Sequence, residues 1–294
     1  MRVLIACDEI AGLGPRSASE LIGTAFAQTG AEVAVIPLGH GGDALADALS
    51  TLEERAQLVR PADLESALVS LVPGPDPLWL DLSQWEAPSL AELTAVLSPE
   101  VVGRVRGGLS GREVVAVVPH AGALAPLTGL SGALAELGRD RGADLAETLA
   151  DDARAEAWAK AIGADPMADG SGALGGVGAA VIALGGRVGS GLELCLAGYD
   201  AARVMGAADV VVTATAQLDF HAVGGPVVKR LSELAALALR PLVVIAGRTF
   251  VSARELRLAG VEAAYAVLPG AGDEEPTPAD LAATAAKVAS TWRW

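Results

Sequence analysis

Aromatic residues, cysteines and long apolar runs are all scarce in this sequence, and each shortage excludes a class of protein. Phe, Trp and Tyr make up 3% of the 294 residues, so small and branched aliphatic side chains must build the core. The two cysteines, Cys7 and Cys195, are too few and too far apart for a disulfide scaffold, a structural zinc site or a CxxC redox motif. No window reaches the ~18 consecutive apolar residues of a membrane span, and the apolar run at the N-terminus is too short for a signal peptide. We therefore expect a cytoplasmic protein with no membrane partner.

Basic residues are scarce as well. Lys and Arg total 21 against 36 Asp and Glu, which gives a formal net charge of −15. Because the chain also has no run of Lys or Arg, this balance argues against nucleic acid as a partner. A hydrophobic content of 52% is too high for a disordered chain, and the length fits about two domains. The sequence leaves the oligomeric state open.

Short apolar runs alternate with helical patterns along the chain, which is typical of a mostly parallel sheet covered by helices. We expect strands at residues 2–7, 32–38, 78–82, 113–119, 209–215, 241–247 and 263–268. We expect helices at residues 17–27, 43–52, 143–162, 192–205, 223–239, 251–258 and 279–290.

The strands at the two chain ends read as unbroken apolar runs, which indicates burial on both faces and one shared sheet. A Pro- and Gly-rich break at residues 72–77 separates them from the middle of the chain. The expected fold class is therefore α/β. Residues 1–62 and 192–294 would form a discontinuous Rossmann-like parallel-sheet domain, and residues 63–191 a second, smaller inserted α/β domain.

Ligands of open parallel sheets bind beyond the carboxyl ends of the strands. Asp8 directly follows the first expected strand, and its carboxylate fits either a catalytic role or an ordinary loop position. The turn that holds His40, Gly41, Gly42 and Asp43 follows the second strand, at the start of an expected helix. Glycine backbone there can approach an anion, although such turns are also common without a ligand. These four residues are candidates for substrate or phosphate binding.

Polar residues also follow two later strands. Thr215, Gln217, Asp219 and His221 come at and after one strand end, and Arg248 follows the next. Asp219 and His221 form a candidate polar pair, and Arg248 could hold an anion, although most exposed arginines have no specific ligand. No two of the three histidines have metal-ligand spacing, so the metal site stays unknown. The residues that we expect to converge on one cleft are Asp8, His40, Asp43, Thr215 and Asp219.

Common nucleotide and hydrolase motifs are missing. The glycines of residues 170–178 follow no clear strand and have no acidic residue about twenty positions on, so they make a poor dinucleotide fingerprint. The chain has neither a GxxxxGK[ST] phosphate loop nor a GxSxG nucleophile elbow.

Several segments, in the same order, resemble the bacterial two-domain glycerate kinases. Residues 172–219 resemble that family's GAAGGLG helix, ADLVIT strand and GEGRLD loop. Asp8 stands where the family has the aspartate of its IAPDSFK opening. The other matching segments are residues 37–43, 127–133, 241–247 and 261–270. The resemblance implies the type I glycerate kinase fold, with ATP and Mg as cofactors for the phosphorylation of glycerate. It also implies catalytic roles for Asp8 and Asp219, with a small organic acid or a nucleotide as ligand.

The departures from the family pattern concern charge. Ala11, Gln217 and Pro226 stand where the family has Lys, Arg and Lys, and His40 replaces an aspartate. The family's Gly-rich anion-binding loop, expected before residue 115, has no counterpart. Phosphoryl transfer depends on positioned cations and backbone donors, so these losses predict a weak or inactive kinase unless Arg16 or Arg248 replaces a lost cation.

Two other interpretations stay open. One is a non-catalytic binding or regulatory protein on the glycerate kinase fold. The other is an enzyme with a changed reaction that uses Asp8, His40 and Asp219 as acid and base groups.

Overall fold

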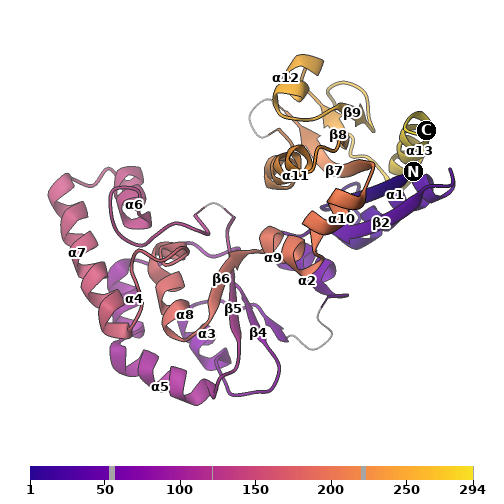
Figure 1. Ribbon diagram of the computed structural model, residues 1–294. Helices are drawn as coiled ribbons and strands as arrows, with labels where there is room; N and C mark the ends of the chain where they lie inside the picture. The colour runs from indigo at the N-terminus through magenta and orange to yellow at the C-terminus, as the bar shows by residue number, and fades with distance from the viewer. Residues whose placement is uncertain (53–56, 121, 220–222, 294) are drawn as a thin grey trace. The chain divides into compact units, whose positions relative to one another are not determined.

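The structure, a computed structural model, describes the chain except residues 53–56, 121, 220–222 and 294, and it forms two compact α/β units (Figure 1). The terminal unit consists of Met1–Gly39, Asp43–Leu52 and Leu192–Trp294. The inserted unit consists of His40–Gly42 and Glu53–Gly191.

The described part of the terminal unit is built on a parallel sheet with the strand order β2-β1-β7-β8-β9. Its strands are β1 (Arg2–Cys7), β2 (Glu32–Pro37), β7 (Val210–Leu218), β8 (Leu242–Thr249) and β9 (Ala263–Ala266). In the centre of the sheet, Ile5 of β1 is in register with Val35 on one side and Val212 on the other. The predicted α/β class, with strands from both chain ends in one parallel sheet, is confirmed.

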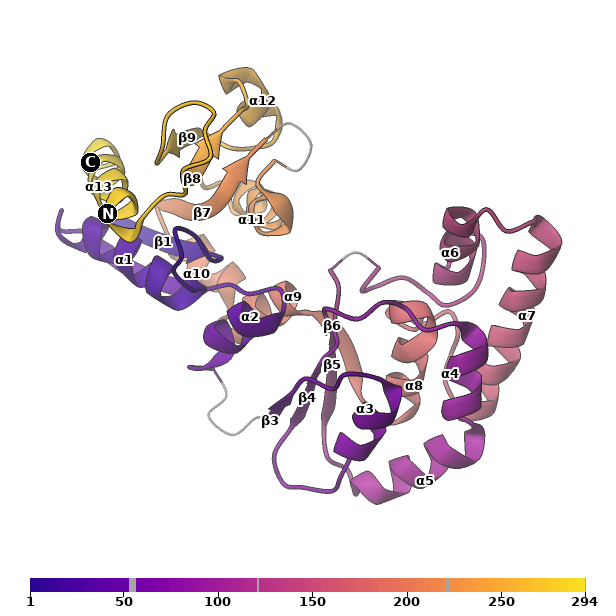
Figure 2. The same ribbon diagram turned by 180° about the vertical axis from the view of Figure 1, so that it is seen from behind.

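Helices cover both faces of this sheet. α1 (Pro15–Ala27) and α13 (Pro278–Thr291) pack side by side on one face, over a core that includes Val3, Ile5 and Phe26 (Figure 2). α10 and α11 pack against the strands from the other face. The remaining bounds are α2 (Gly42–Leu49), α9 (Gly191–Gly198), α10 (Ala201–Ala207), α11 (Gly225–Leu237) and α12 (Ala253–Leu258).

One predicted helix of this unit is wrong. Residues 192–205 form two helices, α9 and α10, because Asp200 takes a left-handed backbone conformation with φ 51° between them. Such a conformation interrupts a right-handed helix. Gly198 just before it packs tightly, since a Cβ there would lie 2.7 Å from Leu52 Cδ1.

The described part of the inserted unit has a parallel sheet of order β3-β4-β5-β6. Its strands are β3 (Gln57–Val59), β4 (Leu78–Asp81), β5 (Val114–Val118) and β6 (Arg187–Ser190). Its helices are α3 (Leu64–Ser70), α4 (Leu90–Val96), α5 (Pro99–Leu109), α6 (Ala133–Arg141), α7 (Leu145–Ile162), the 3₁₀ helix η1 (Ala173–Gly176) and α8 (Val177–Ala183). Leu78, Leu80 and Leu82 face a core formed with α4, α5, α7 and α8. In the described residues, no helix is long and apolar enough to cross a membrane.

Candidate functional site

A tight turn follows β1 at the carboxyl edge of the terminal sheet. Ile10 and Leu13 exchange backbone hydrogen bonds of 3.1 and 2.9 Å, with Ala11 and Gly12 between them. Both central residues have positive φ, 56° and 70°, as a type I′ turn requires. Asp8, just before the turn, accepts the backbone N–H of Glu9 at 2.8 Å. The position that resembles a family lysine is thus the Ala11 methyl group at the tip of the turn.

Three sequence-predicted residues come together at the end of β7. Side chains two positions apart in a strand lie on the same side of the sheet. This spacing places Thr215, Gln217 and Asp219 on one side. Gln217 Nε2 donates to Asp219 Oδ2 at 3.0 Å, and Thr215 Oγ1 donates to the carbonyl oxygen of Gly224 at 3.2 Å. His221, the fourth candidate of this segment, lies outside the described residues.

Arg248 of β8 is paired in register with Gln217, and its guanidinium bonds to backbone oxygens. Nη1 donates to the carbonyls of Pro269 and Gly270 at 3.2 and 2.8 Å, and Nη2 donates to that of Glu274 at 2.8 Å. These three bonds hold the 269–274 segment against the sheet edge.

A cavity of about 520 Å³ lies at this edge of the terminal unit. Gln217 and Arg248 line it, together with the 9–14 turn and residues 272–276. Its acidic lining residues are Glu9, Asp273, Glu274 and Glu275, so we call it the acidic cavity. Among the described residues that line the cavity, four are acidic and one, Arg248, is basic, so the lining carries a net negative charge, which is unfavourable for a phosphate group.

The turn after β2 is divided between the units. His40, Gly41 and Gly42 belong to the inserted unit, whereas Asp43 belongs to the terminal unit, in the first turn of α2. The N–H of Gly42 points to the Asp81 carboxylate, with a distance of 2.9 Å to Oδ2. The convergence on one cleft that we expect for Asp8, His40, Asp43, Thr215 and Asp219 stays a prediction.

Polar residues that the sequence analysis missed gather at the carboxyl ends of the inserted sheet. Asp81 ends β4, Arg60 follows β3, and Ser190 ends β6. Ser190 is buried, and its hydroxyl lies 3.0 Å from Nδ1 of His120, which follows β5. The sequence signal for Asp81 was available, because Asp81 is a carboxylate inside the apolar run of residues 78–82, where it can be buried only if other groups bond to it.

The Gly-rich stretch 170–178 serves packing. A Cβ on Gly178 would lie 1.9 Å from the carbonyl oxygen of Gly170, and one on Gly172 would lie 2.2 Å from that of Pro126. The N–H groups of Gly172 and Gly175 donate to backbone carbonyls within the unit. Gly172 and Gly178 therefore allow close backbone contact, and the N–H groups of Gly172 and Gly175 bond to the protein backbone.

The two cysteines are poor nucleophiles. Burial raises the pKa of the Cys7 thiol to about 12 and that of the Cys195 thiol to about 11. Among the described residues, no group of three or more His, Cys, Asp or Glu side chains could hold a metal ion.

Comparison with known proteins identifies the family. The sequence model of the glycerate kinase family matches residues 113–293. The chain belongs to the glycerate kinase family. An uncharacterized protein of Mycobacterium bovis and one of Mycobacterium tuberculosis are each 31% identical to this family member over 165 residues. Each match covers 53% of the chain and 42% of the relative, so the chain spans less than half the length of these relatives.

A solved structure has the same fold. The crystal structure of a Salmonella typhimurium LT2 protein named as a glycerate kinase 2 aligns with a TM-score of 0.61 and 18% sequence identity. The alignment covers 99% of this family member and 98% of the Salmonella chain. The glycerate kinase fold expected from the sequence is therefore confirmed.

Proposed function

We propose that this glycerate kinase family member has weak or no turnover in the family reaction, the ATP-dependent phosphorylation of glycerate. The observation that carries the proposal is the bonding of Arg248. Among the described residues that line the acidic cavity, Arg248 is the one cation, and it donates to the carbonyls of Pro269, Gly270 and Glu274. It therefore does not replace the basic residues that the family has at Ala11 and Gln217.

The energetic cost of these changes is large. Catalysis of phosphoryl transfer is mostly positioning and neutralisation of charge, and one lost preorganised donor costs ~2.7–4 kcal/mol. Two such losses would slow the reaction by roughly four to six powers of ten. Pro226, the third changed position, lies in the first turn of α11 and has neither a side-chain charge nor a backbone N–H.

The residues of the acidic cavity do not fit magnesium nucleoside triphosphate. Four carboxylates and a guanidinium that already bonds to backbone oxygens offer little to a polyphosphate. The described residues also provide no cluster of carboxylates that could hold the metal.

The second candidate function is non-catalytic binding of a small organic acid by the 40–43 turn. One observation favours it: the turn is held firmly although the cations for catalysis are missing. Both backbone polar groups of Gly42 are hydrogen-bonded, the N–H to Asp81 and the carbonyl to Arg60.

A coupled ADP-release assay with D-glycerate and Mg-ATP tests the first proposal. We expect no rate above the ATPase blank for the natural chain, and a measurable rate for the Ala11→Lys/Gln217→Arg double variant. The matched control is Ala11→Ser/Gln217→Asn, which changes both sites without adding charge. Family-level turnover in the natural chain that Asp8→Asn abolishes would refute the proposal.

A thermal-shift titration tests whether the protein binds D-glycerate or Mg-ATP. A ligand at 100 times its dissociation constant stabilises a protein by ~2.7 kcal/mol. We expect stabilisation by D-glycerate and none by Mg-ATP. No shift with either compound would refute the binding proposal.

A further inference from the structure

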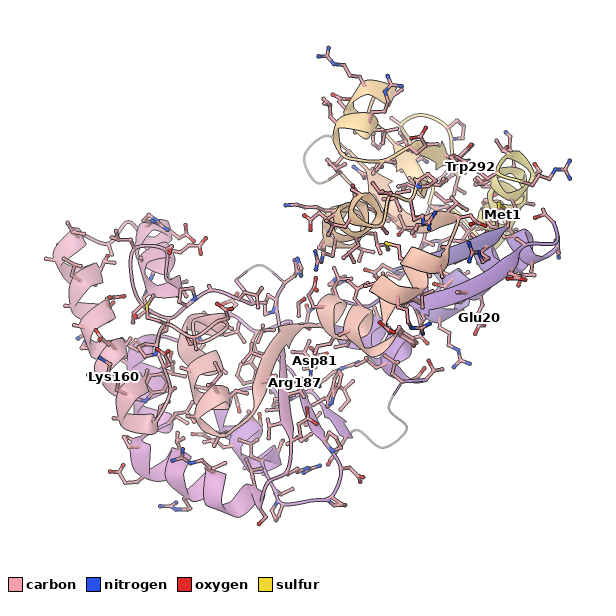
Figure 3. All side chains as sticks on the ribbon, viewed as in Figure 1. Met1, Glu20, Asp81, Lys160, Arg187 and Trp292 are labelled. Carbon is pink, nitrogen blue, oxygen red and sulfur yellow. The ribbon has the colours of Figure 1, made fainter. Side chains whose placement is uncertain are left out.

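Asp81 is a buried carboxylate at the carboxyl end of β4. The residue is 5% exposed, and its neighbours Leu80 and Leu82 point into the core of the inserted unit. Figure 3 labels Asp81, which lies where the strand meets the turns at the sheet edge. A buried charge is costly unless partners satisfy it, so its hydrogen bonds show what holds it there.

Those partners come from three separate segments. Oδ2 accepts the N–H of Gly42 at 2.9 Å and lies 3.5 Å from Nε of Arg60. Oδ1 accepts the N–H of Ser83 at 3.1 Å and its hydroxyl at 2.6 Å. Arg60 completes the arrangement, since its Nη2 donates to the carbonyl oxygen of Gly42 at 2.5 Å. Asp81 and Arg60 therefore hydrogen-bond to the two peptide groups on either side of the Gly42 Cα.

The backbone of the turn also lies close against this cluster. A Cβ on Gly41 would lie 2.0 Å from Ser83 Oγ and 2.6 Å from Ser83 Cβ, so no side chain fits there. Gly42 has φ 61°, which favours glycine. Close approach and hydrogen bonding thus place residues 40–42, Arg60 and Asp81–Ser83 in one cluster, which we call the Asp81 clamp.

We propose that Asp81 is a positioning residue that fixes the 40–42 turn, and with it His40, for contact with a small hydroxy acid. The inference rests on the proposed binding function of this turn. Asp81 itself acts through Gly42, because its oxygens accept donors from the protein. Rigid backbone at the contact lowers the entropy lost on binding, which is how the clamp would raise affinity.

The test compares Asp81→Asn with a matched control. Asn keeps the shape but has one acceptor oxygen, so it cannot satisfy both Gly42 and Ser83. The control is Asp209→Asn in the terminal unit. Asp209 lies at the amino end of β7, and both of its carboxylate oxygens accept hydrogen bonds from Arg2. The backbone N–H of Arg2 donates to Oδ2 at 2.8 Å, and its Nη2 donates to Oδ1 at 3.0 Å. A second variant, Arg60→Met, removes the guanidinium that bonds to the Gly42 carbonyl. The Arg60 side chain is 42% exposed, so we expect the fold to tolerate this change.

Two measurements are made on each full-length variant: hydrogen exchange of the 40–43 amides and the D-glycerate dissociation constant by calorimetry. We expect Asp81→Asn and Arg60→Met to raise exchange at least tenfold and to weaken D-glycerate binding at least tenfold. We expect Asp209→Asn to change neither. Unchanged exchange in the two clamp variants would overturn the proposal.

Two further outcomes separate this inference from the proposed function. If exchange rises while D-glycerate affinity stays constant, the positioning role is wrong and the proposed binding function stands. If the natural chain does not bind D-glycerate at all, the binding function fails, and the positioning role falls with it. Equal loss of affinity in Asp209→Asn would also overturn the inference, because general destabilisation would then explain it.

Discussion

Replacement of Gly178 by alanine should destabilise the inserted unit because the added methyl group would overlap a backbone carbonyl oxygen. The Cβ would lie 1.9 Å from the carbonyl oxygen of Gly170 and 3.1 Å from the Cβ of Ala173. The backbone must shift to admit it, and overpacking of this kind costs about 1–3 kcal/mol or more. The matched control is Gly103→Ala in α5, where a Cβ meets no atom within 4 Å. An exposed helical Gly→Ala change stabilises by about 0.5–1 kcal/mol.

Urea unfolding followed by tryptophan fluorescence measures both effects. Three of the five tryptophans of the sequence, Trp79, Trp85 and Trp158, lie in the inserted unit, so most of the fluorescence signal comes from that unit. With a slope of about 2 kcal/mol per molar urea, the midpoint should fall by roughly 0.5–1.5 M for Gly178→Ala. It should rise by roughly 0.3–0.5 M for Gly103→Ala. If Gly178→Ala unfolds at the same urea concentration as the natural chain, close packing does not explain the glycine at this position.

Three further predictions concern the terminal unit. Ala11→Asn creates an Asn-Gly pair at two positive-φ positions, so the free energy of unfolding should rise by about 0.5 kcal/mol. Ala11→Val should lower it, and urea unfolding measures both changes. Arg248→Met removes three hydrogen bonds to backbone carbonyls and should lower the free energy of unfolding by ~1–2 kcal/mol. An unchanged free energy of unfolding would contradict this structural role. Because burial raises the pKa of Cys7 and Cys195 to about 12 and about 11, the unfolded chain loses thiol protons first as pH rises above 9. Stability should therefore fall between pH 9 and 11, and an equally steep fall in a variant with both cysteines replaced by alanine would contradict this.

The sequence predicted the terminal sheet well because its strands are continuous apolar runs. β1, β7 and β8 are each buried along most of their length, and burial on both faces is what an unbroken run implies. The inserted unit was harder. β3 and β6 are three and four residues long and contain Gln, Arg and Gly, so only their pairing with β4 and β5 defines them as strands.

The candidate site was also predicted only in part. The position of a polar residue after a strand indicates that it lies at the edge of the sheet, but it does not indicate which groups its side chain hydrogen-bonds to. Asp81 sits in an apolar run that reads as a strand through residue 82, and its partners Gly42 and Arg60 lie 39 and 21 positions away. A charge inside such a run is itself a signal, because it can be buried only if distant groups bond to it.

Arg248 is the opposite case. In the sequence it counts as a spare cation that could replace a lost lysine, whereas in the structure it bonds to the 269–274 backbone. A cation contributes to catalysis only where its donors reach the reacting group, so the bonding of Arg248 to backbone carbonyls supports the proposal of weak phosphoryl transfer.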